Sequence, residues 1–324
     1  MEEIIISTLM RPGFLKIFAF LGLVGYILAG GRTDLRIKAG ALLSGISTLD
    51  VISAGKINTS LNVDVIRFRK TPEIITGLVK GEIDVAVIPA EMAAKLYENG
   101  AKIKIISADM FQNQAVLSIS NNIKNVFDLK GKKIAALLAS GTFMTFKSYL
   151  LESYKMEDGK DYTVINAVPG ALPDILKKGD ADAVVVWEPL VSLLLSQGAH
   201  VVVSFDQLWK SLGYSGKPVM LVWVTSPHFN SRKIIDEFVK LRERAANYWI
   251  NHPEETVNIL KSTYQFKEKV ANSIYKRVSI VTCGLTPEII KNIRKVWRIS
   301  WKGGYLEKNP ETIPDSIFYR SQDG

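Results

Sequence analysis

The stretch Gly-Glu-Ile-Asp-Val-Ala-Val-Ile at residues 81–88 is matched 98 residues later by Gly-Asp-Ala-Asp-Ala-Val-Val-Val at residues 179–186. Each copy follows a helical pattern that ends in lysine, and its glycine stands where a helix end favours a left-handed residue. In each copy an Asp, at position 84 or 182, then opens an apolar, β-branched run that is typical of a buried strand. A shorter pair, residues 41–45 and 137–141, repeats at a similar spacing. The repeat favours two lobes of one topology, and chance similarity between two strand–helix–strand units is the alternative.

Short apolar runs alternate with helical patterns on both sides of each copy. We expect ten strands, at residues 35–39, 62–67, 85–88, 104–107, 115–120, 133–137, 163–167, 183–187, 200–204 and 218–225. This alternation predicts an α/β chain with mostly parallel sheets. Residues 231–275 have a helical pattern with a break at His252-Pro253. A further helix begins at Thr286-Pro287, with Thr as its N-cap and Pro in its first turn.

We expect these late helices to pack against the first lobe, which makes that lobe discontinuous. The predicted division is residues 32–112 plus 219–324 for the first lobe and residues 113–218 for the second. The strands near 114–120 and 219–225 are the expected crossings between the lobes.

The first 31 residues are predicted to be a targeting segment. Thirteen uncharged, mostly apolar residues run from Ile17 to Ala29, with Arg11 and Lys16 before them and two glycines after them. This pattern is typical of a secretory signal, and the run is shorter than the roughly 20 residues of a bilayer span. An uncleaved anchor and a buried core helix are the alternatives, and Met10 would be a more usual start than Met1. The charge bias predicts an extracytoplasmic location, in the periplasm or at the cell surface, for the rest of the chain.

Composition excludes several classes of protein. A single cysteine, Cys283, allows neither an intrachain disulfide nor a cysteine metal cluster, and three scattered histidines do not suggest a metal site. The net charge is +9, but no nucleic-acid-binding motif accompanies it. Ten Lys or Arg and two Glu lie between Lys261 and Lys302, either as a solvated helical face or as a docking surface for an acidic partner or lipid. We find no nucleophile–base pair, so we predict no catalytic residue, no metal and no cofactor.

Several stretches in this order resemble the solute-binding proteins of ABC importers, in the nitrate/sulfonate/taurine and thiamine-pyrimidine (NMT1-like) group. They are the leader, Gly-Glu-Ile-Asp at 81–84, Asp-Leu-Lys-Gly-Lys-Lys at 128–133, Ala-Ser-Gly-Thr at 139–142, and the run from 179 into Trp187-Glu188-Pro189. The resemblance covers roughly residues 34–250 and implies the type II periplasmic binding protein fold, with two α/β lobes joined by two crossing strands. It matches the tail beyond about residue 260 less well.

Ligands of open α/β sheets bind beyond the carboxyl ends of the strands, where helices begin. The candidate ligand-binding residues therefore lie in the loops that follow the strands, and Thr71 is expected to be an N-cap. They are Leu43, Ser44, Gly45, Thr71, Pro89, Ala90, Glu91, Asp109, Phe111, Gln112 and Asn113 in the first lobe, and Ser140, Gly141, Thr142, Pro169, Gly170, Trp187, Glu188 and Tyr214 in the second.

Helix starts at Ser140–Thr142, and at Ser44–Gly45 opposite, would present free N–H groups to an anion such as a sulfonate, carboxylate or nitrate. Ordinary N-caps are the alternative for both. Three aromatic residues, Phe111, Trp187 and Tyr214, stack on the ligand or belong to the core. Glu91, Asp109 and Glu188 argue partly against an anion and for a ligand with an amine or pyrimidine N–H, and Glu188 could instead cap its own helix.

The predicted function is the extracytoplasmic solute-binding component of an ABC importer. It would capture a small organic anion, such as a sulfonate, taurine or nitrate, between its two lobes by hinge closure, and deliver it to a membrane permease. A monomer and no nucleic-acid partner are expected. The alternatives are a thiamine-pyrimidine binding protein, an enzyme on the same fold in pyrimidine or menaquinone-precursor biosynthesis, and a sensor.

Overall fold

The computed structural model of the protein describes residues 35–321. The predicted targeting segment, residues 1–31, lies outside the described residues. Within residues 35–321, every helix is too short or too polar to cross a bilayer.

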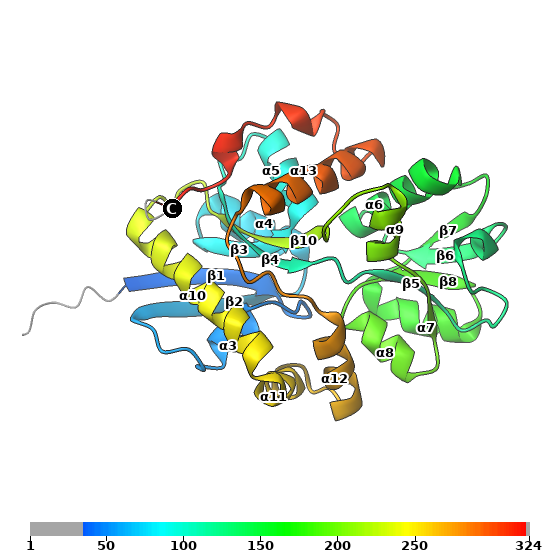
Figure 1. Ribbon diagram of the computed structural model, residues 1–324, viewed down its shortest axis with the longest axis horizontal. Helices are drawn as coiled ribbons and strands as arrows, with labels where there is room; N and C mark the ends of the chain where they lie inside the picture. The colour runs from blue at the N-terminus through cyan, green and yellow to red at the C-terminus, as the bar shows by residue number, and fades with distance from the viewer. Residues whose placement is uncertain (1–34, 322–324) are drawn as a thin grey trace, which may run out of the picture. The chain divides into compact units, whose positions relative to one another are not determined.

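Two five-stranded sheets form the framework (Figure 1). The first has the order β2-β1-β3-β10-β4, and we call the part of the chain that carries it lobe 1. Its strands are β1 (Leu35–Leu42), β2 (Leu61–Phe68), β3 (Val85–Pro89), β4 (Ile105–Phe111) and β10 (Val219–Thr225). The helices between them are α3 (Leu49–Ser53), α4 (Thr71–Lys80) and α5 (Ala90–Glu98).

The second sheet has the order β7-β6-β8-β5-β9, and the part that carries it is lobe 2. Its strands are β5 (Ala115–Ser118), β6 (Lys133–Ala136), β7 (Thr163–Asn166), β8 (Ala183–Val186) and β9 (His200–Ser204). Its helices are α6 (Gly141–Tyr149), which continues as a π-helical turn (Leu150–Tyr154), α7 (Leu172–Lys178), α8 (Leu190–Ser196) and α9 (Phe205–Ser211), with 3₁₀ turns at Val126–Leu129 and Pro169–Ala171.

All ten predicted strands are present, but the expectation of mostly parallel sheets was wrong for two of them. Strand β10 is antiparallel to both of its neighbours, β3 and β4. Strand β5 is likewise antiparallel to β8 and β9. These are the first strand after each passage between the sheets, so each enters a sheet against the direction of the strands beside it. Both sheets are therefore mixed.

The repeated sequence has the same structural role in both lobes. Gly81 and Gly179 end α4 and α7 in the left-handed region, with φ of 75° and 76°, as predicted. Asp84 then accepts the backbone N–H of Lys38 in the neighbouring strand at 2.7 Å, and Asp182 accepts that of Lys133 at 2.8 Å. The repeated motif thus fixes the start of one strand to the next in each lobe, which is a structural role.

The chain passes between the sheets twice, after β4 and before β10. The two passages lie side by side, because the Gln112 N–H donates to the Pro218 carbonyl at 2.8 Å. A third segment joins them, since the Phe111 N–H donates to Ser279 O at 2.9 Å. The predicted division at residues 112/113 and 218/219 places its boundaries in these passages, and we keep it as our proposal for the limits of the lobes.

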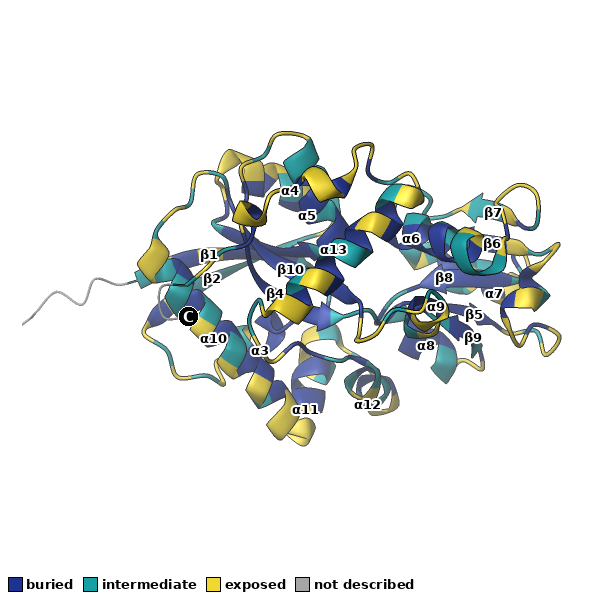
Figure 2. Cartoon of the chain, turned by 45° about the horizontal axis from the view of Figure 1, so that its top comes forward, coloured by how far each residue is buried: buried dark blue, intermediate teal, exposed yellow. Residues whose placement is uncertain are grey.

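The chain ends in four longer helices, α10 (Arg232–Asn251), α11 (Pro253–Tyr264), α12 (Glu268–Arg277) and α13 (Pro287–Lys302), followed by 3₁₀ turns at Pro310–Thr312 and Asp315–Ile317. Helix α10 packs on α3 of lobe 1, as expected. Helices α12 and α13 differ from the expectation, because they also contact lobe 2: α12 lies on α8, and α13 lies on both α5 and α6. Figure 2 shows α13 between α5 and α6, with its buried face turned inward.

One hydrophobic core runs through this contact. It includes Ala90 of α5, Val296 and Trp297 of α13, and Phe143 and Phe146 of α6, so apolar packing is continuous from one lobe into the other. The Trp297 indole N–H donates to Ala90 O at 2.7 Å, which fixes α13 to the start of α5. Burial of this apolar surface stabilises the present arrangement of the two lobes.

Gly303→Ala is expected to lower the free energy of unfolding by about 1–3 kcal/mol. A Cβ at this position would lie 2.2 Å from the carbonyl oxygen of Met144 and would push the end of α13 away from α6. Urea unfolding measures the change. Gly284→Ala is the matched control, because its Cβ would meet only the far end of the Glu243 side chain at 3.1 Å. Equal destabilisation of both variants would contradict this account of the packing.

Candidate functional site

The start of α6 offers two unused hydrogen-bond donors. The Ser140 hydroxyl accepts the Phe143 N–H at 3.1 Å and donates to Leu137 O at 2.6 Å, so it is a conventional N-cap. Within residues 35–321, nothing accepts the N–H groups of Gly141 and Thr142. Helix starts carry a partial positive charge, and unpaired N–H groups there are suited to an anion. The prediction of a seat at Ser140–Thr142 therefore has a geometric basis at two of its three residues.

The carboxyl group of Glu91, from the first turn of α5 in lobe 1, faces this helix start. A Cβ built on Gly141 would lie only 2.0 Å from Glu91 Oε1, so no larger residue fits at position 141 without displacing the carboxyl group. Glu91 is 5% exposed, and no Lys, Arg or His of the described chain forms an ion pair with it. Burial raises the pKa of the Glu91 carboxyl group to about 7, although its own backbone N–H partly opposes the rise.

The opposite loop, predicted as a second seat, is largely satisfied from within lobe 1. The Gly45 N–H donates to Leu42 O at 3.1 Å, and Gly45 O accepts the Tyr264 hydroxyl at 2.6 Å. Further along, two buried carboxylates take the next N–H groups: Asp50 accepts that of Ser47 at 3.1 Å, and Asp109 accepts that of Thr48 at 3.3 Å. Leu43 and Ser44 are exposed on the surface. The N–H groups of Ser44 and Ile46 have no acceptor among the described residues, but they precede α3 and are not part of its first turn, so the helix dipole adds less to them than at the start of α6.

Asp109 was predicted to lie in the loop after the fourth strand, and this was wrong. Strand β4 continues to Phe111, so Asp109 is an interior residue of the strand and is fully buried. It accepts the indole N–H of Trp223 at 2.8 Å and the hydroxyl of Thr48. Burial raises the pKa of Asp109, against which these hydrogen bonds and the nearby Arg242 act. Its role is to fix the loop before α3 to the sheet.

Glu188 has both a cap and a salt bridge. Its carboxylate accepts the backbone N–H of Ser192 at 3.1 Å and the Ser192 hydroxyl at 3.0 Å, which caps α8. It also pairs with Arg277 of α12 at 2.8 Å. The alternative in which Glu188 caps its own helix is the one that the structure has, and the carboxylate additionally joins lobe 2 to α12. It is not left free for a ligand.

The three aromatic candidates make packing contacts. Trp187 packs against the core formed by α10–α12, and Phe111 packs against the main core under Lys217. Tyr214 lies against Trp209, with ring centroids 4.7 Å apart, and carries Lys295 of α13 over its face. All three are half-buried, and each packs against core side chains.

The remaining predicted residues lie in different parts of the structure. Gln112 accepts the Tyr149 hydroxyl of α6 at 3.2 Å, and Asn113 accepts the Glu188 N–H at 3.2 Å, so both join the passage between lobes to lobe 2. Pro89 is the N-cap of α5, next to Ala90. The prediction of Thr71 as an N-cap was wrong, because Lys70 is the N-cap of α4. The Glu73 carboxylate accepts the backbone N–H groups of Arg69 and Lys70. Pro169 and Gly170 lie in an exposed turn of lobe 2, and a Cβ on Gly170 would meet open space.

Three residues were not predicted from the sequence: Tyr149 and Tyr305, which interact electrostatically with Glu91, and Arg277, which pairs with Glu188. Tyr149 lies two turns along α6, and Tyr305 follows α13; burial raises the pKa of each, and the charge of Glu91 raises it further. Arg277 lies in the basic stretch that was treated as a solvated face or docking surface. The buried face of α6, with Gly, Thr, Ser and Tyr at residues 141, 145, 148 and 149, was a signal of close helix packing.

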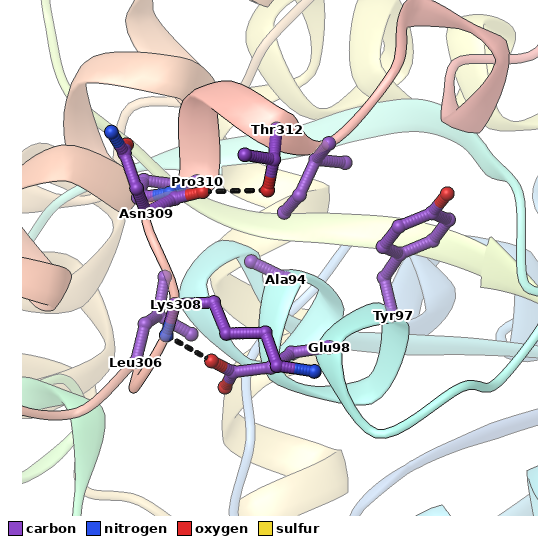
Figure 3. A pocket seen from close by; sticks show the side chains of 9 residues that line it. Ala94, Tyr97, Glu98, Leu306, Lys308, Asn309, Pro310 and Thr312 are labelled. Atoms are coloured by element: carbon purple, nitrogen blue, oxygen red, sulfur yellow. Dashed lines mark hydrogen bonds between the residues drawn. The ribbon is translucent and has the colours of Figure 1, made fainter.

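Two cavities lie elsewhere and include none of the predicted residues. One, of about 170 Å³, lies between α5 and residues 306–313 (Figure 3) and is lined by Ala94, Tyr97, Glu98, Leu306, Lys308, Asn309, Pro310, Thr312 and Ile313. The Glu98 carboxylate there is already used, since it accepts the Glu307 N–H at 2.8 Å and the Lys308 N–H. The other, of about 350 Å³, is lined by Lys104, Arg232, Asp315, Ser316, Phe318, Tyr319 and Arg320.

Comparison with known proteins gives one family. The sequence profile described as "NMT1/THI5 like" matches residues 58–256, which is more than half of the chain. A protein of Bacillus subtilis (strain 168), described as a candidate aliphatic sulfonates-binding protein, is 23% identical over 266 residues, which cover 80% of this chain and 78% of that protein.

Solved structures show the same fold. The periplasmic aliphatic sulphonate binding protein SsuA from Escherichia coli superposes with a TM-score of 0.71 at 16% identity, over 85% of this chain and 89% of that one. The periplasmic nitrate-binding protein NrtA from Synechocystis PCC 6803 gives 0.65 at 16% identity, over 87% and 86%. The predicted periplasmic binding protein fold, with two α/β lobes joined by two crossing strands, is confirmed.

Arg277→Met is expected to lower the free energy of unfolding by about 3 kcal/mol near pH 8, because it leaves the fully buried Glu188 carboxylate without its cation. Burial already raises the pKa of Glu188, and the loss of Arg277 raises it further. A raised pKa in the folded state gives stability that is present at low pH and is lost as the pH rises, so the defect should shrink near pH 5.

Urea unfolding of the wild type and the variant at both pH values measures this dependence. Glu188→Gln in the Arg277→Met background removes the unpaired charge, and it should recover part of the loss near pH 8. A defect of the same size at both pH values would contradict the assignment to this salt bridge.

Proposed function

This chain belongs to the NMT1/THI5-like family, and from that membership we propose that it is the extracytoplasmic solute-binding component of an ABC importer. Its ligand is a small organic anion held between the lobes, and its membrane partner is a permease. The names of the relatives support this class, since they bind aliphatic sulfonates or nitrate. The protein binds and releases its ligand without chemical change.

The observation that carries the ligand class is the α6 start, where the N–H groups of Gly141 and Thr142 have no acceptor among the described residues. Two adjacent N–H groups at a helix start bind an oxyanion directly, and the helix dipole adds to the attraction. Gly141 allows a ligand to approach the backbone as closely as the Glu91 carboxyl group now does. A sulfonate has three oxygens and needs only donors, which matches such a seat.

Hinge closure follows from the arrangement of the chain. Helix α6 belongs to lobe 2, whereas Glu91 comes from lobe 1, so a ligand at the α6 start touches both lobes. Opening would turn the lobes about the paired passages at Gln112 and Pro218 and would part α6 from α13 and α8 from α12. A ligand that contacts both lobes stabilises the closed state by its extra contacts there.

Glu91 favours a second ligand class. An ionised, buried carboxylate without a cation accepts hydrogen bonds well, so a ligand with an amine or a pyrimidine N–H would satisfy it. A thiamine-pyrimidine ligand is therefore the second candidate within the same binding function.

Isothermal titration against ethanesulfonate, taurine, nitrate, a dicarboxylate and an aminopyrimidine tests the ligand class. We expect ethanesulfonate to bind, and Gly141→Ala to weaken binding by at least about tenfold, because the added methyl group covers the N–H pair and collides with Glu91. Gly284→Ala, remote from α6 along the chain, should bind like the wild type. Binding of the aminopyrimidine alone would replace the anion by the second class, and binding of none of the five would contradict both.

A further inference from the structure

The start of α6 has an acidic neighbour that borders the place proposed for the ligand. Glu91 Oε1 would lie 2.0 Å from a Cβ on Gly141, so the carboxyl group fills the space directly against the first residue of the helix. Helix α6 is nine residues long, and Glu91 is almost fully buried. A buried acid that is aimed at a helix start and has no ion-pair partner in residues 35–321 is the same chemical group that a carboxylate ligand would bring.

An anion and an ionised Glu91 carboxylate exclude each other at this seat. The Glu91 carboxyl group lies beside Gly141, so an anion on the N–H groups of Gly141 and Thr142 would lie close to it, and two negative charges in a buried place repel strongly. The Glu91 side chain has little freedom to leave, because α5 is held at its first residue by the Trp297–Ala90 hydrogen bond and is covered by α13. Protonation of the Glu91 carboxyl group removes this repulsion and allows an anion to bind beside it.

The groups that face Glu91 from neighbouring elements are Tyr149 of α6 and Tyr305, which follows α13. Burial raises the pKa of both hydroxyls, so they stay neutral and uncharged at neutral pH. Within α5, Lys95 pairs with Glu98 and Glu307 instead. No cation of the described chain therefore offsets the charge of Glu91, whose pKa burial raises to about 7.

Resting on the proposed function, we propose that Glu91 determines the specificity of the α6 site, which accepts an anion together with one proton. The proton comes from solvent and binds a Glu91 carboxylate oxygen. The neutral carboxyl group then donates its O–H to an oxygen of the ligand, beside the N–H groups of Gly141 and Thr142. A sulfonate, which has acceptors and no donor, meets three donors in this state. A ligand with its own N–H would pair instead with the ionised carboxylate, and its affinity would have the opposite pH dependence.

Isothermal titration with ethanesulfonate near pH 6 and pH 8 tests the proposal. Sulfonates stay ionised at both values, so the dependence reports on the protein. For a carboxyl group that titrates near pH 7 and must be protonated to bind, the wild-type Kd should rise about tenfold between the two. Titrations near pH 8 in two buffers of different ionisation enthalpy should show an uptake that approaches one proton for each ligand bound.

Glu91→Gln keeps the shape and a donor but cannot titrate. Its Kd should be the same at both pH values, within about threefold of the wild-type value near pH 6, and without proton uptake. Glu98→Gln is the matched control on the same helix, since Glu98 is paired with Lys95 and the 307–308 backbone, and it should keep the wild-type pH dependence. Should Glu91→Gln fail to fold, the wild-type two-buffer titration still decides.

The outcomes separate the two claims. Ethanesulfonate binding by the wild type with equal Kd at both pH values and no proton uptake would overturn the role of Glu91 and leave the proposed function intact. Loss of the pH dependence in Glu98→Gln but not in Glu91→Gln would also overturn it. Absence of ethanesulfonate binding at either pH would overturn the proposed anion ligand, and this inference with it.

Discussion

A helix cannot supply acceptors for its own first N–H groups, so they must be found outside it or left open. In α6, Ser140 satisfies the Phe143 N–H, and the N–H groups of Gly141 and Thr142 are left open among the described residues. The Glu91 carboxyl group of lobe 1 lies against the first residue of α6, where a Cβ on Gly141 would be 2.0 Å from Glu91 Oε1. This single constraint connects the fold to the function, because the open donors belong to lobe 2 and the group that meets them belongs to lobe 1.

The two lobes share a sequence repeat but differ at the place where it would bind a ligand. In lobe 1 the N–H groups of Ser47 and Thr48 are used by Asp50 and Asp109, two fully buried carboxylates. In lobe 2 no such internal carboxylate serves α6, and the acid comes from across the boundary as Glu91. The repeated Asp84 and Asp182 connect neighbouring strands, and within residues 35–321 their carboxylates accept no N–H group of either loop. Similar backbones therefore carry a loop with two buried carboxylates of its own on one side, and on the other a helix start whose acidic neighbour belongs to the opposite lobe.

Most of the fold could be predicted from the sequence because its signals are local. Strand order along the chain, the left-handed Gly81 and Gly179, and the Thr286 cap of α13 depend on residues within a few positions of each other. Other features join residues that lie 50 to more than 100 positions apart, or depend on the packing of the two lobes. They are the antiparallel insertion of β5 and β10, the pairing of Glu188 with Arg277, and the approach of Glu91 to Gly141. No periodicity or motif encodes such distances. For the same reason, Asp109 was predicted in a loop, whereas the pairing of β4 with β10 continues to Phe111 and makes Asp109 an interior residue of the strand.

The position of a bound anion tests the central claim most directly. A crystal structure with 2-bromoethanesulfonate, whose bromine can be located by anomalous scattering, fixes the ligand and its direction independently of any affinity. We expect sulfonate oxygens within about 3.2 Å of the N atoms of Gly141 and Thr142, with the Glu91 carboxyl group beside them. A sulfonate bound elsewhere on the protein, with these two N–H groups open or bonded to water, would contradict it.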